Sequence, residues 1–171
     1  MSEFANSVEL IAAARTGDRA AFGALYERYG RMIHGILLSR VAPADADDLV
    51  QEVFLTAMKQ IAKLREPEKF GAWLAAMARN RSNDLLRRSA RSTELPEEIA
   101  VREQASAEAE AAHALRVIQQ LPEAYRETLV LRLVEGMTGP EIAERTGLTP
   151  DSVRVNLHRG MKALRARLEG R

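Results

Sequence analysis

Apolar side chains recur at intervals of three or four residues along most of the chain, which is the spacing that gives an α-helix one apolar face. Residues 18–40, 43–64 and 70–88 form long stretches of this kind, and a shorter stretch ends near Gly17. No segment alternates apolar and polar residues over the length of a strand, and no Asn-Gly or Asp-Gly pair marks a hairpin. The sequence therefore predicts an all-α fold.

Capping residues refine where these helices begin. Asn6, followed by Glu9, is predicted to open the first helix, Asp18 to cap the second, and Pro43 to begin the third. The buried side of the second helix is predicted to consist of Phe22, Leu25, Tyr26, Tyr29, Ile33 and Leu37. Residues 65–69 are polar, contain a proline and are predicted to form a loop.

The composition changes in the middle of the chain. Between residues 94 and 110, six glutamates oppose one arginine, and large apolar residues are few. Such a segment buries too little surface to offset its ordering entropy, so residues 91–110 are predicted to be a flexible acidic linker. Two small helical domains are expected on either side of it, at 1–90 and 111–171.

Two helix starts follow one another near the end of the chain. Thr138 with Glu141 fits a capping box, and Gly147 ends that helix. Thr149 can cap a second helix that has Pro150 in its first turn. Two helices joined by a tight, glycine-containing turn form a helix-turn-helix, whose second helix can enter the major groove of DNA. Two further helices are expected ahead of this pair, at 111–120 and 122–135.

The second helix of this pair has an apolar side and a basic side. The apolar stripe is expected to pack on the rest of the domain and consists of Val153, Leu157, Met161, Leu164 and Leu168. Six basic residues oppose two acidic ones from Asp151 to the end of the chain. An ordinary solvated amphipathic helix also has a charged side, but the tandem caps and the clustered basic residues together favour DNA binding.

Composition narrows the class of protein. Of the 171 residues, 46% are hydrophobic and 29% are charged, which is ordinary for a soluble helical protein. No apolar run approaches the ~20 residues that cross a bilayer, and the first residues do not resemble a signal peptide. Cysteine is absent, which excludes disulfides and thiolate zinc sites. These features fit a cytoplasmic protein, and the net charge of +1 conceals the clustering of the basic residues.

The sequence contains no recognisable catalytic or cofactor-binding motif. It has no glycine-rich phosphate loop, no HExxH and no GxSxG. His34, His113 and His158 do not share the spacing of metal ligands. No metal and no cofactor are therefore expected.

Two charged clusters in the first domain each have two explanations. The acidic residues at 45–52 could complement the dipole of the helix that they begin, or could form a docking face for a basic partner. Residues 77–91 form a basic helix with asparagines, about two turns after Trp73. This helix could hold phosphates and exposed bases, or its arginines could be a solvated face with Trp73 in the core.

Three stretches of the chain together resemble one known family. They are DADDLVQEVFLTAMKQ, FGAWLAAMARNRSNDLLRR and LPEAYRETLVLRLVEGMTGPEIAERTGLTPDSVRVNLHRGMKALRARL. In this order, around an acidic linker, they are similar to the extracytoplasmic-function branch of bacterial sigma factors over about residues 18–90 and 111–168. The resemblance implies a promoter-specificity subunit of RNA polymerase with no catalytic activity of its own.

The resemblance also implies roles for the first domain. Its first stretch would dock on the β′ clamp helices of polymerase, and the residues carried over for docking are Asp48, Leu49, Gln51, Glu52 and Phe54. The next stretch, with the loop before it, would read and melt the minus-ten promoter element and hold a flipped base. The residues placed against that DNA are Lys63, Lys69, Trp73, Arg79, Asn80, Asn83, Arg87 and Arg88.

The C-terminal helix-turn-helix would read the minus-35 element and lie near the β flap of polymerase. The residues placed against this DNA are Arg154, Val155, Asn156, His158, Arg159, Lys162 and Arg165, of which the last two would hold phosphate. Relatives are commonly held inactive by an anti-sigma protein, so the resemblance implies one here.

Two other classes of protein stay open at this point. A stand-alone helix-turn-helix regulator would use the first domain to dimerise or to sense a signal, but it leaves DDLVQEVF and the arginine-rich helix without a purpose. An enzyme such as a nuclease would need a cluster of metal-binding carboxylates near the basic helix. Asp84 alone is insufficient for that.

Overall fold

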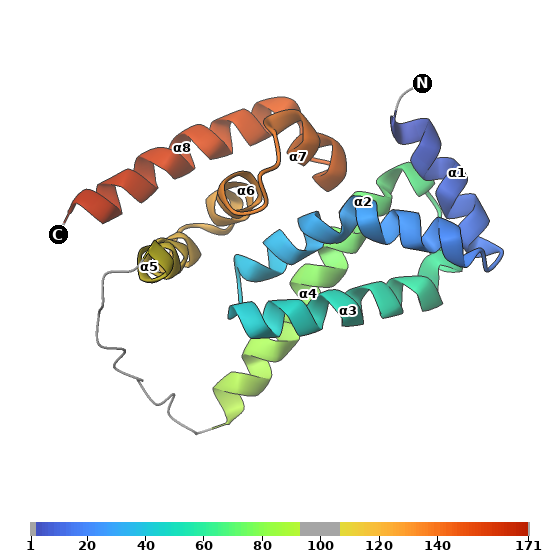
Figure 1. The fold of residues 1–171 in the computed structure, drawn as a ribbon, viewed down its shortest axis with the longest axis horizontal. Coiled ribbons are helices and arrows are strands. Elements are labelled where there is room, and N and C mark those ends of the chain that lie inside the picture. Colours follow the sequence, from blue (N-terminus) through green and yellow to red (C-terminus); the bar gives the residue numbers. More distant parts are fainter. Residues whose placement is uncertain (1–2, 93–106, 171) are drawn as a thin grey trace.

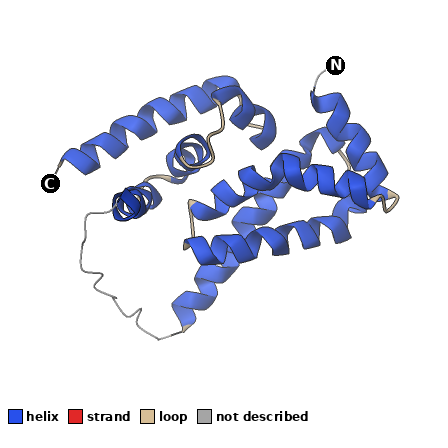
Figure 2. Cartoon of the chain, viewed as in Figure 1, coloured by secondary structure: helices blue, strands red, loops and turns tan. Residues whose placement is uncertain are grey.

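The computed structural model describes residues 3–92 and 107–170, with side chains from residue 7 onward. All regular structure in these ranges is helical, and no strand occurs within them (Figures 1 and 2). The predicted all-α fold is therefore confirmed. None of the described helices combines the length and the apolar character that crossing a membrane requires. Most of the predicted linker, residues 93–106, lies outside the described residues.

Four helices form the N-terminal lobe, residues 3–92. They are α1 (Glu3–Arg15), α2 (Arg19–Leu38), α3 (Pro43–Gln60) and α4 (Phe70–Arg91), with short 3-10 turns at Ile61–Lys63 and Pro67–Lys69 before α4. Helix α2 lies at the centre and packs on the other three (Figure 1). Met32, Ile33 and Ile36 on α2 have no solvent exposure and belong to the same core cluster as Leu74 of α4.

The predicted helix starts of this lobe agree with the structure in two of three cases. Asp18 accepts hydrogen bonds from two backbone N–H groups of the first turn of α2, at 2.9 and 3.1 Å, and so caps that helix. Pro43 stands in the first turn of α3. The prediction for the first helix is wrong, because α1 begins at Glu3 and Asn6 lies inside it.

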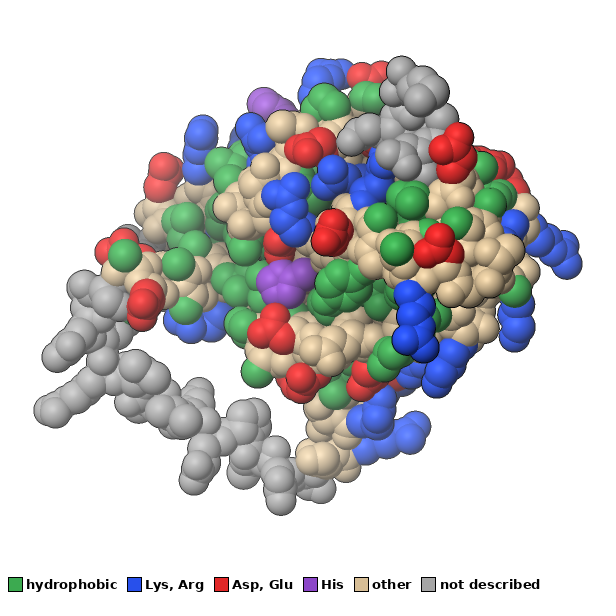
Figure 3. Space-filling model, turned by 45° about the vertical axis from the view of Figure 1, so that its right-hand side comes forward, with side chains coloured by type: hydrophobic (Ala, Val, Ile, Leu, Met, Phe, Trp, Pro, Cys, Tyr) green, Lys and Arg blue, Asp and Glu red, His purple; other side chains and the backbone are tan. Residues whose placement is uncertain are grey.

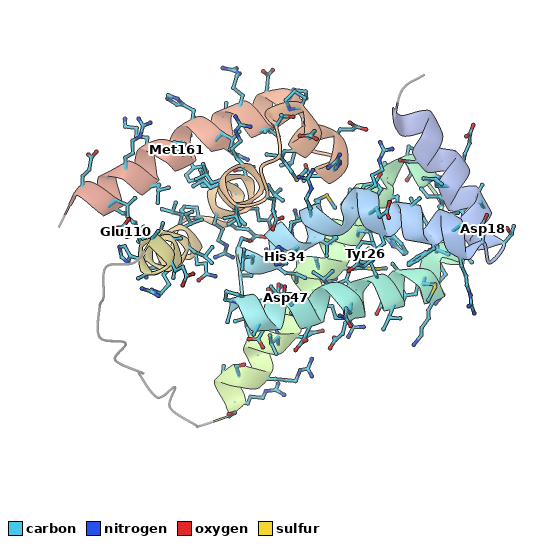
Figure 4. All side chains as sticks on the ribbon, viewed as in Figure 1. Asp18, Tyr26, His34, Asp47, Glu110 and Met161 are labelled. Carbon is cyan, nitrogen blue, oxygen red and sulfur yellow. The ribbon has the colours of Figure 1, made fainter. Side chains whose placement is uncertain are left out.

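The buried side of α2 is as predicted except at Tyr26. The buried members are Leu25, Tyr29, Ile33 and Leu37, and Phe22 is half-buried. Tyr26 is instead 42% exposed, and its ring centroid lies 4.6 Å from that of Phe54 in α3. Figure 4 shows it where α2 meets α3. A tyrosine suits this edge, since its ring can pack on an apolar neighbour while its hydroxyl stays in water.

Four further helices form the C-terminal lobe, residues 107–170. They are α5 (Ala107–Gln119), α6 (Glu123–Leu133), α7 (Gly139–Thr146) and α8 (Pro150–Glu169). Helix α6 packs on the other three, and its fully buried Leu129 belongs to the same cluster as Ile142 of α7 and Val153 of α8. Helix α5 begins before the predicted Ala111, so residues 107–110 are helical.

The two lobes pack against each other, with α2 and α4 on one side and α6 and α7 on the other (Figure 1). Two glycines permit this close approach. A Cβ atom at Gly35 of α2 would lie 2.6 Å from Cδ2 of Leu131, and one at Gly71 of α4 would lie 1.9 Å from the carbonyl oxygen of Arg145. Because the interior is close-packed, a side chain at either position would force the facing helix to move.

Candidate nucleic-acid interface

The predicted helix-turn-helix is present as α7 and α8. The hydroxyl of Thr138 accepts a hydrogen bond from the backbone N–H of Glu141 at 3.3 Å, and the carboxylate of Glu141 accepts one from the backbone N–H of Thr138 at 2.7 Å. That backbone bond, with a second from the Thr138 hydroxyl, lowers the pKa of Glu141. The chain then turns at Gly147, whose φ of 78° is left-handed and is adopted most readily by glycine.

Helix α8 begins as predicted. Thr149 accepts a hydrogen bond from a backbone N–H of the first turn at 3.1 Å, and Pro150 occupies the first position. The predicted apolar stripe is right at Val153 and Leu164, which are 1% and 6% exposed. It is wrong at Leu168, which is 40% exposed, because the last turn of α8 lies at the edge of the lobe (Figure 1).

Sequence reasoning missed Gly160, which is buried where α8 crosses α6. A Cβ atom there would lie 3.1 Å from Cδ1 and Cγ of Leu129 and 3.2 Å from Cβ of Tyr125. The signal was available, since Gly160 continues the apolar stripe three residues after Leu157 and four before Leu164. A search for hydrophobic side chains passes over it, because glycine has none.

The basic side of α8 is exposed, as a DNA-reading helix requires. The exposed members of the predicted set are Arg154, His158, Arg159, Lys162 and Arg165. Arg154 also pairs with Asp151 at 3.3 Å, and an ion pair this exposed contributes little to stability. Val155 and Asn156 are half-buried, and Asn156 lines a hollow between the lobes together with Arg79.

A groove runs beside this basic side, between the end of α6 and α8. Its apolar lining includes Leu133, Leu157 and Met161, the last of which is labelled in Figure 4. Its basic lining consists of Arg132, His158, Lys162 and Arg165. Part of the predicted DNA-binding set therefore also borders an apolar surface.

The end of α4 is exposed and basic. Arg87, Arg88 and Arg91 line a shallow depression with Asp84, which pairs with Arg87 at 3.8 Å. Figure 3 shows basic side chains gathered there, next to the point where the described part of the lobe ends. Asn80, two turns earlier, is exposed as well. These guanidinium and amide groups are donors suited to phosphates and base edges.

The loop before α4 and its first turn carry the other predicted minus-ten residues. Lys63 and Lys69 are exposed. Glu66 lies 2.6 Å from the ammonium of Lys69, and this hydrogen bond raises the pKa of the lysine. Trp73 is half-buried, with its ring centroid 5.8 Å from that of Phe70. The side chain also packs against the core of the lobe.

Two predicted minus-ten residues belong to a hydrogen-bond network that reaches the C-terminal lobe. Arg79 donates to both carboxylate oxygens of Glu127, at 2.9 and 2.8 Å, and this bonding raises the pKa of Arg79. Asn83 accepts a hydrogen bond from Arg40 at 3.2 Å, and Arg40 also reaches Glu127 at 3.3 Å. Nothing in the local sequence signals these contacts, because Glu127 lies in the other lobe and Arg40 lies 43 positions from Asn83.

The acidic side of α3 is exposed at Asp48, Gln51 and Glu52. Leu49 and Phe54, the other two residues placed against polymerase, are 5% and 3% exposed and belong to the core. Leu55 and Met58, which sequence reasoning missed, are 53% and 47% exposed on the same helix. They follow Glu52 at helical spacing, so the periodicity could have identified them.

The described residues contain no group of three or more histidine or acidic side chains placed to hold a metal ion.

Two family models match the chain: Sigma-70 region 2 at residues 25–92 and Sigma-70, region 4 at residues 114–164. The RNA polymerase sigma factor CarQ of Myxococcus xanthus is 32% identical over 162 residues, which cover 88% of this chain and 91% of CarQ. This chain belongs to the sigma factors of bacterial RNA polymerase. The resemblance inferred from its sequence is confirmed.

Further relatives place this sigma factor in the extracytoplasmic-function branch. The ECF RNA polymerase sigma factor SigM of Mycobacterium tuberculosis is 31% identical, over 96% of this chain and 85% of SigM. The solved structure of CnrH in complex with the cytosolic domain of CnrY has a TM-score of 0.65 and 28% identity, covering 96% of this chain and 98% of that one. RpoE, crystallised with the anti-sigma factor NepR from Bartonella quintana, agrees in fold, with a TM-score of 0.57 and 18% identity over 86% of this chain and 95% of that one.

The two family matches fall on the two candidate surfaces of this sigma factor. The region 2 match includes α3 and α4, and the region 4 match includes α7 and most of α8. Proteins of this family are transcription initiation factors.

Proposed function

We propose that this sigma factor binds core RNA polymerase and directs transcription from promoters whose minus-ten and minus-35 elements it recognises. One observation carries the proposal: a single chain has two separate basic helices, α4 and α8, and an exposed acidic helix, α3. A stand-alone helix-turn-helix regulator would need α8 but would have no use for the exposed sides of α3 and α4.

Helix α8 is proposed to read the minus-35 element. Arg154, His158 and Arg159 lie on the exposed side of its first half, the part of a recognition helix that reaches base edges in the major groove. An arginine placed there can make bidentate hydrogen bonds to guanine. Lys162 and Arg165 follow along the helix, where they would hold phosphates and fix its register.

The N-terminal lobe is proposed to recognise and melt the minus-ten element. The exposed arginines at the end of α4 would hold the phosphates of the separated strand, and Asn80 offers an amide for a base edge. Trp73, which is only partly buried, would stack on a base. Lys63 and Lys69 are the ends of the loop proposed to take the flipped base, which would help to offset the few kcal/mol that base extrusion costs.

The exposed side of α3 is proposed to dock on the β′ clamp helices of polymerase. Asp48 and Glu52 offer negative charge, and Leu55 and Met58 offer apolar contact beside it. The groove between α6 and α8 is proposed to meet the β flap in the same complex. The chain would therefore act as a non-catalytic initiation factor, in the cytoplasm where polymerase and promoter are found.

An anti-sigma protein is proposed to control this chain. The similar protein CnrH is in complex with the cytosolic domain of CnrY, which supports a partner of that kind here. A helix with an apolar side and acidic flanks would suit the groove between α6 and α8. It would cover His158 and Lys162, and so would prevent α8 from reaching the minus-35 element.

Run-off transcription with purified core polymerase on a genomic promoter library tests the function. The chain should bind duplex promoter weakly alone, bind it strongly once core polymerase is added, and direct transcripts from a defined set of starts. Tight binding of a palindromic operator by a dimer of the chain, without polymerase, would instead identify a stand-alone regulator. Turnover of DNA with magnesium and no polymerase would identify an enzyme.

A further inference from the structure

The loop between α3 and α4, residues 61–69, is anchored in the core by two side chains. Ile61 and Leu64 are 4% and 8% exposed and belong to the core cluster. The neighbours of Leu64 along the chain, Lys63 and Arg65, are both exposed. The loop therefore presents polar side chains to solvent from a backbone that the core holds at two positions.

The backbone of this loop leaves its helical course at Leu64, whose φ of −67° and ψ of 117° are extended. Within the loop, the carbonyl oxygen of Ile61 accepts a hydrogen bond from the backbone N–H of Leu64 at 3.2 Å. Carbonyl groups at the end of a helical turn need further partners from outside that turn. A side chain of another helix supplies them here.

Arg15, the last residue of α1, bonds to this loop through its guanidinium group. Its Nε donates to the carbonyl oxygen of Ile61 at 3.3 Å, and its Nη2 donates to that of Leu64. The two carbonyl groups are three residues apart, with Lys63 between them. Helix α1 packs on both 3-10 turns of the loop, and Figure 1 shows it alongside the segment that joins α3 to α4.

The end of α1 that carries Arg15 is itself held in place. Gly17, with a φ of 92°, turns the chain, and the backbone N–H of Asp18 donates to the carbonyl oxygen of Ala13 at 3.2 Å. Asp18 then caps α2. Ile11, about one turn before Arg15, has no solvent exposure. Arg15 therefore acts from a rigid support, which is what allows a side chain to fix the group that it binds.

The second half of the loop is held by local contacts of a different kind. Glu66 pairs with the exposed ammonium of Lys69 at 2.6 Å, and its carbonyl oxygen accepts a hydrogen bond from the backbone N–H of Lys69 at 2.9 Å. These contacts form within the loop and do not tie it to the rest of the lobe. The bonds from Arg15 do, so they set where the first half of the loop stands relative to α4.

We propose that Arg15 is a positioning residue for promoter melting, which holds the loop in the shape that takes the flipped base. Arg15 acts through the carbonyl groups of Ile61 and Leu64 and does not touch DNA. A loop that is ordered beforehand loses less conformational freedom when the base binds. The assignment rests on the proposed function, because that function gives the loop its base, whereas the hydrogen bonds themselves do not.

Three variants of the full-length chain separate the bonds of Arg15 from its charge. R15A removes both bonds. R15K keeps the positive charge but replaces the planar fork of donors with a single ammonium, so it restores the tie only in part. R19A is the matched control, because Arg19 is an exposed arginine in the first turn of α2, four residues along the chain.

The first measurement is hydrogen exchange of the free chain by mass spectrometry, with circular dichroism to show that each variant keeps its helices. Amides of residues 61–69 should exchange faster in R15A than in wild type, since exchange reports local opening. Exchange in α8 should not change, and R19A should match wild type throughout. Equal exchange of the loop in R15A and wild type would overturn the proposal.

The second measurement is the affinity of the complex with core polymerase for single-stranded minus-ten DNA that carries each of the four bases at the flipped position. Wild type should prefer one base. In R15A this preference should fall roughly tenfold, within the range of one lost base contact, and R15K should lie between the two. Affinity for core polymerase and dependence on the minus-35 element should not change. A role in folding alone would reduce all of these together and would overturn the proposal.

The third measurement compares run-off transcription from a duplex promoter and from one whose minus-ten region is mismatched and already separated. R15A should be impaired on the duplex and close to wild type on the separated template, where capture of the base is no longer needed to help melting. An equal defect on both templates would overturn the proposal.

The proposed function and the role of Arg15 fail in different ways. If wild type shows no base preference at the flipped position, the loop does not have its proposed role, and the positioning falls with it, even where exchange confirms the bonds. If wild type shows a preference that R15A retains although its loop exchanges faster, only the positioning is overturned.

Discussion

Thr138 and Glu141 determine where α7 begins, because the side chain of each accepts a hydrogen bond from the backbone N–H of the other. The Thr138 hydroxyl satisfies a backbone N–H that the helix itself cannot. We expect T138A to lower the free energy of unfolding by about 0.5–2 kcal/mol, the usual range for loss of an N-cap. Urea denaturation followed by circular dichroism measures it. T138S retains the oxygen and should stay close to wild type; an equal loss in both variants would show that the methyl group matters rather than the cap.

Glu141 should make this cap dependent on pH. Its pKa is lowered from the ordinary value of 4.5 because the backbone N–H and then the hydroxyl of Thr138 donate to the carboxylate. A pKa lowered by folding means that the ionised form stabilises the fold, so this contribution is present above the ordinary value and is lost as pH falls through the lowered one. The difference in unfolding free energy between wild type and E141Q should therefore shrink from pH 7 to pH 3. A difference that stays constant would show that the ionised carboxylate does not stabilise the cap.

Arg159 is the residue on which the reading of the minus-35 element is best tested. It is exposed on α8, and a bidentate contact with a base is worth roughly 1–3 kcal/mol. With core polymerase, R159A should reduce transcription from promoters that have the upstream element. Arg167 is an exposed arginine of the same helix that faces Gln120 at 3.4 Å, so R167A is a control of equal charge. Equal losses in the two variants would indicate a general charge effect.

Residues of the site were predictable from sequence where their role is local. The caps at Asp18, Thr138 and Thr149 follow from a few neighbouring residues, and the structure has all three. The partners of Arg79 were not predictable, because Glu127 lies 48 positions away and reaches it only through folding. A one-letter pattern can show that a residue is basic, but it cannot show which carboxylate has already bound it.

The spacing of apolar residues predicted the helices well, because that spacing reflects the one face of each helix that is buried. It failed where a helix continues past its neighbours, as at Leu168, and where the contact needs the absence of a side chain, as at Gly160. The family resemblance, for its part, placed Leu49 and Phe54 on a docking surface, although both lie in the core. Periodicity identifies a stripe, but only packing shows which side of a helix is covered.

Gly160 is the position at which the packing of α8 on α6 can be tested. Added carbon atoms in a packed core cost about 1–3 kcal/mol, and a Cβ at Gly160 already lies 3.1 Å from two atoms of Leu129. We expect G160V to lower the free energy of unfolding by that amount in urea denaturation. It should also weaken promoter-directed transcription, because α8 would no longer pack closely on α6. G23V is the control, since its site is open. Wild-type stability in G160V would show that α6 and α8 can move apart freely.

The arrangement of the lobes is the part of the structure that the sequence did not predict. It depends on two surfaces of opposite charge, whose residues are scattered along the chain. Arg28 pairs with Glu144, for example, and Arg40 pairs with Glu123. Their complementarity exists only after both lobes have folded. Composition then gives a net charge close to zero, and periodicity gives two separate bundles, so neither indicates that the bundles meet.

The distance between the two promoter elements tests both lobes together. If core polymerase holds both lobes on DNA as proposed, α8 meets the minus-35 element at a fixed rotation around the duplex relative to the N-terminal lobe on the minus-ten element. A duplex turns once in about 10–10.5 base pairs, so an insertion of about five base pairs between the elements rotates the upstream one to the opposite side. We expect this insertion to reduce run-off transcription to the level of a promoter that lacks the minus-35 element. The same insertion placed upstream of that element should have no effect. Undiminished transcription from the rotated promoter would mean that the lobes act independently and that α8 does not read the element.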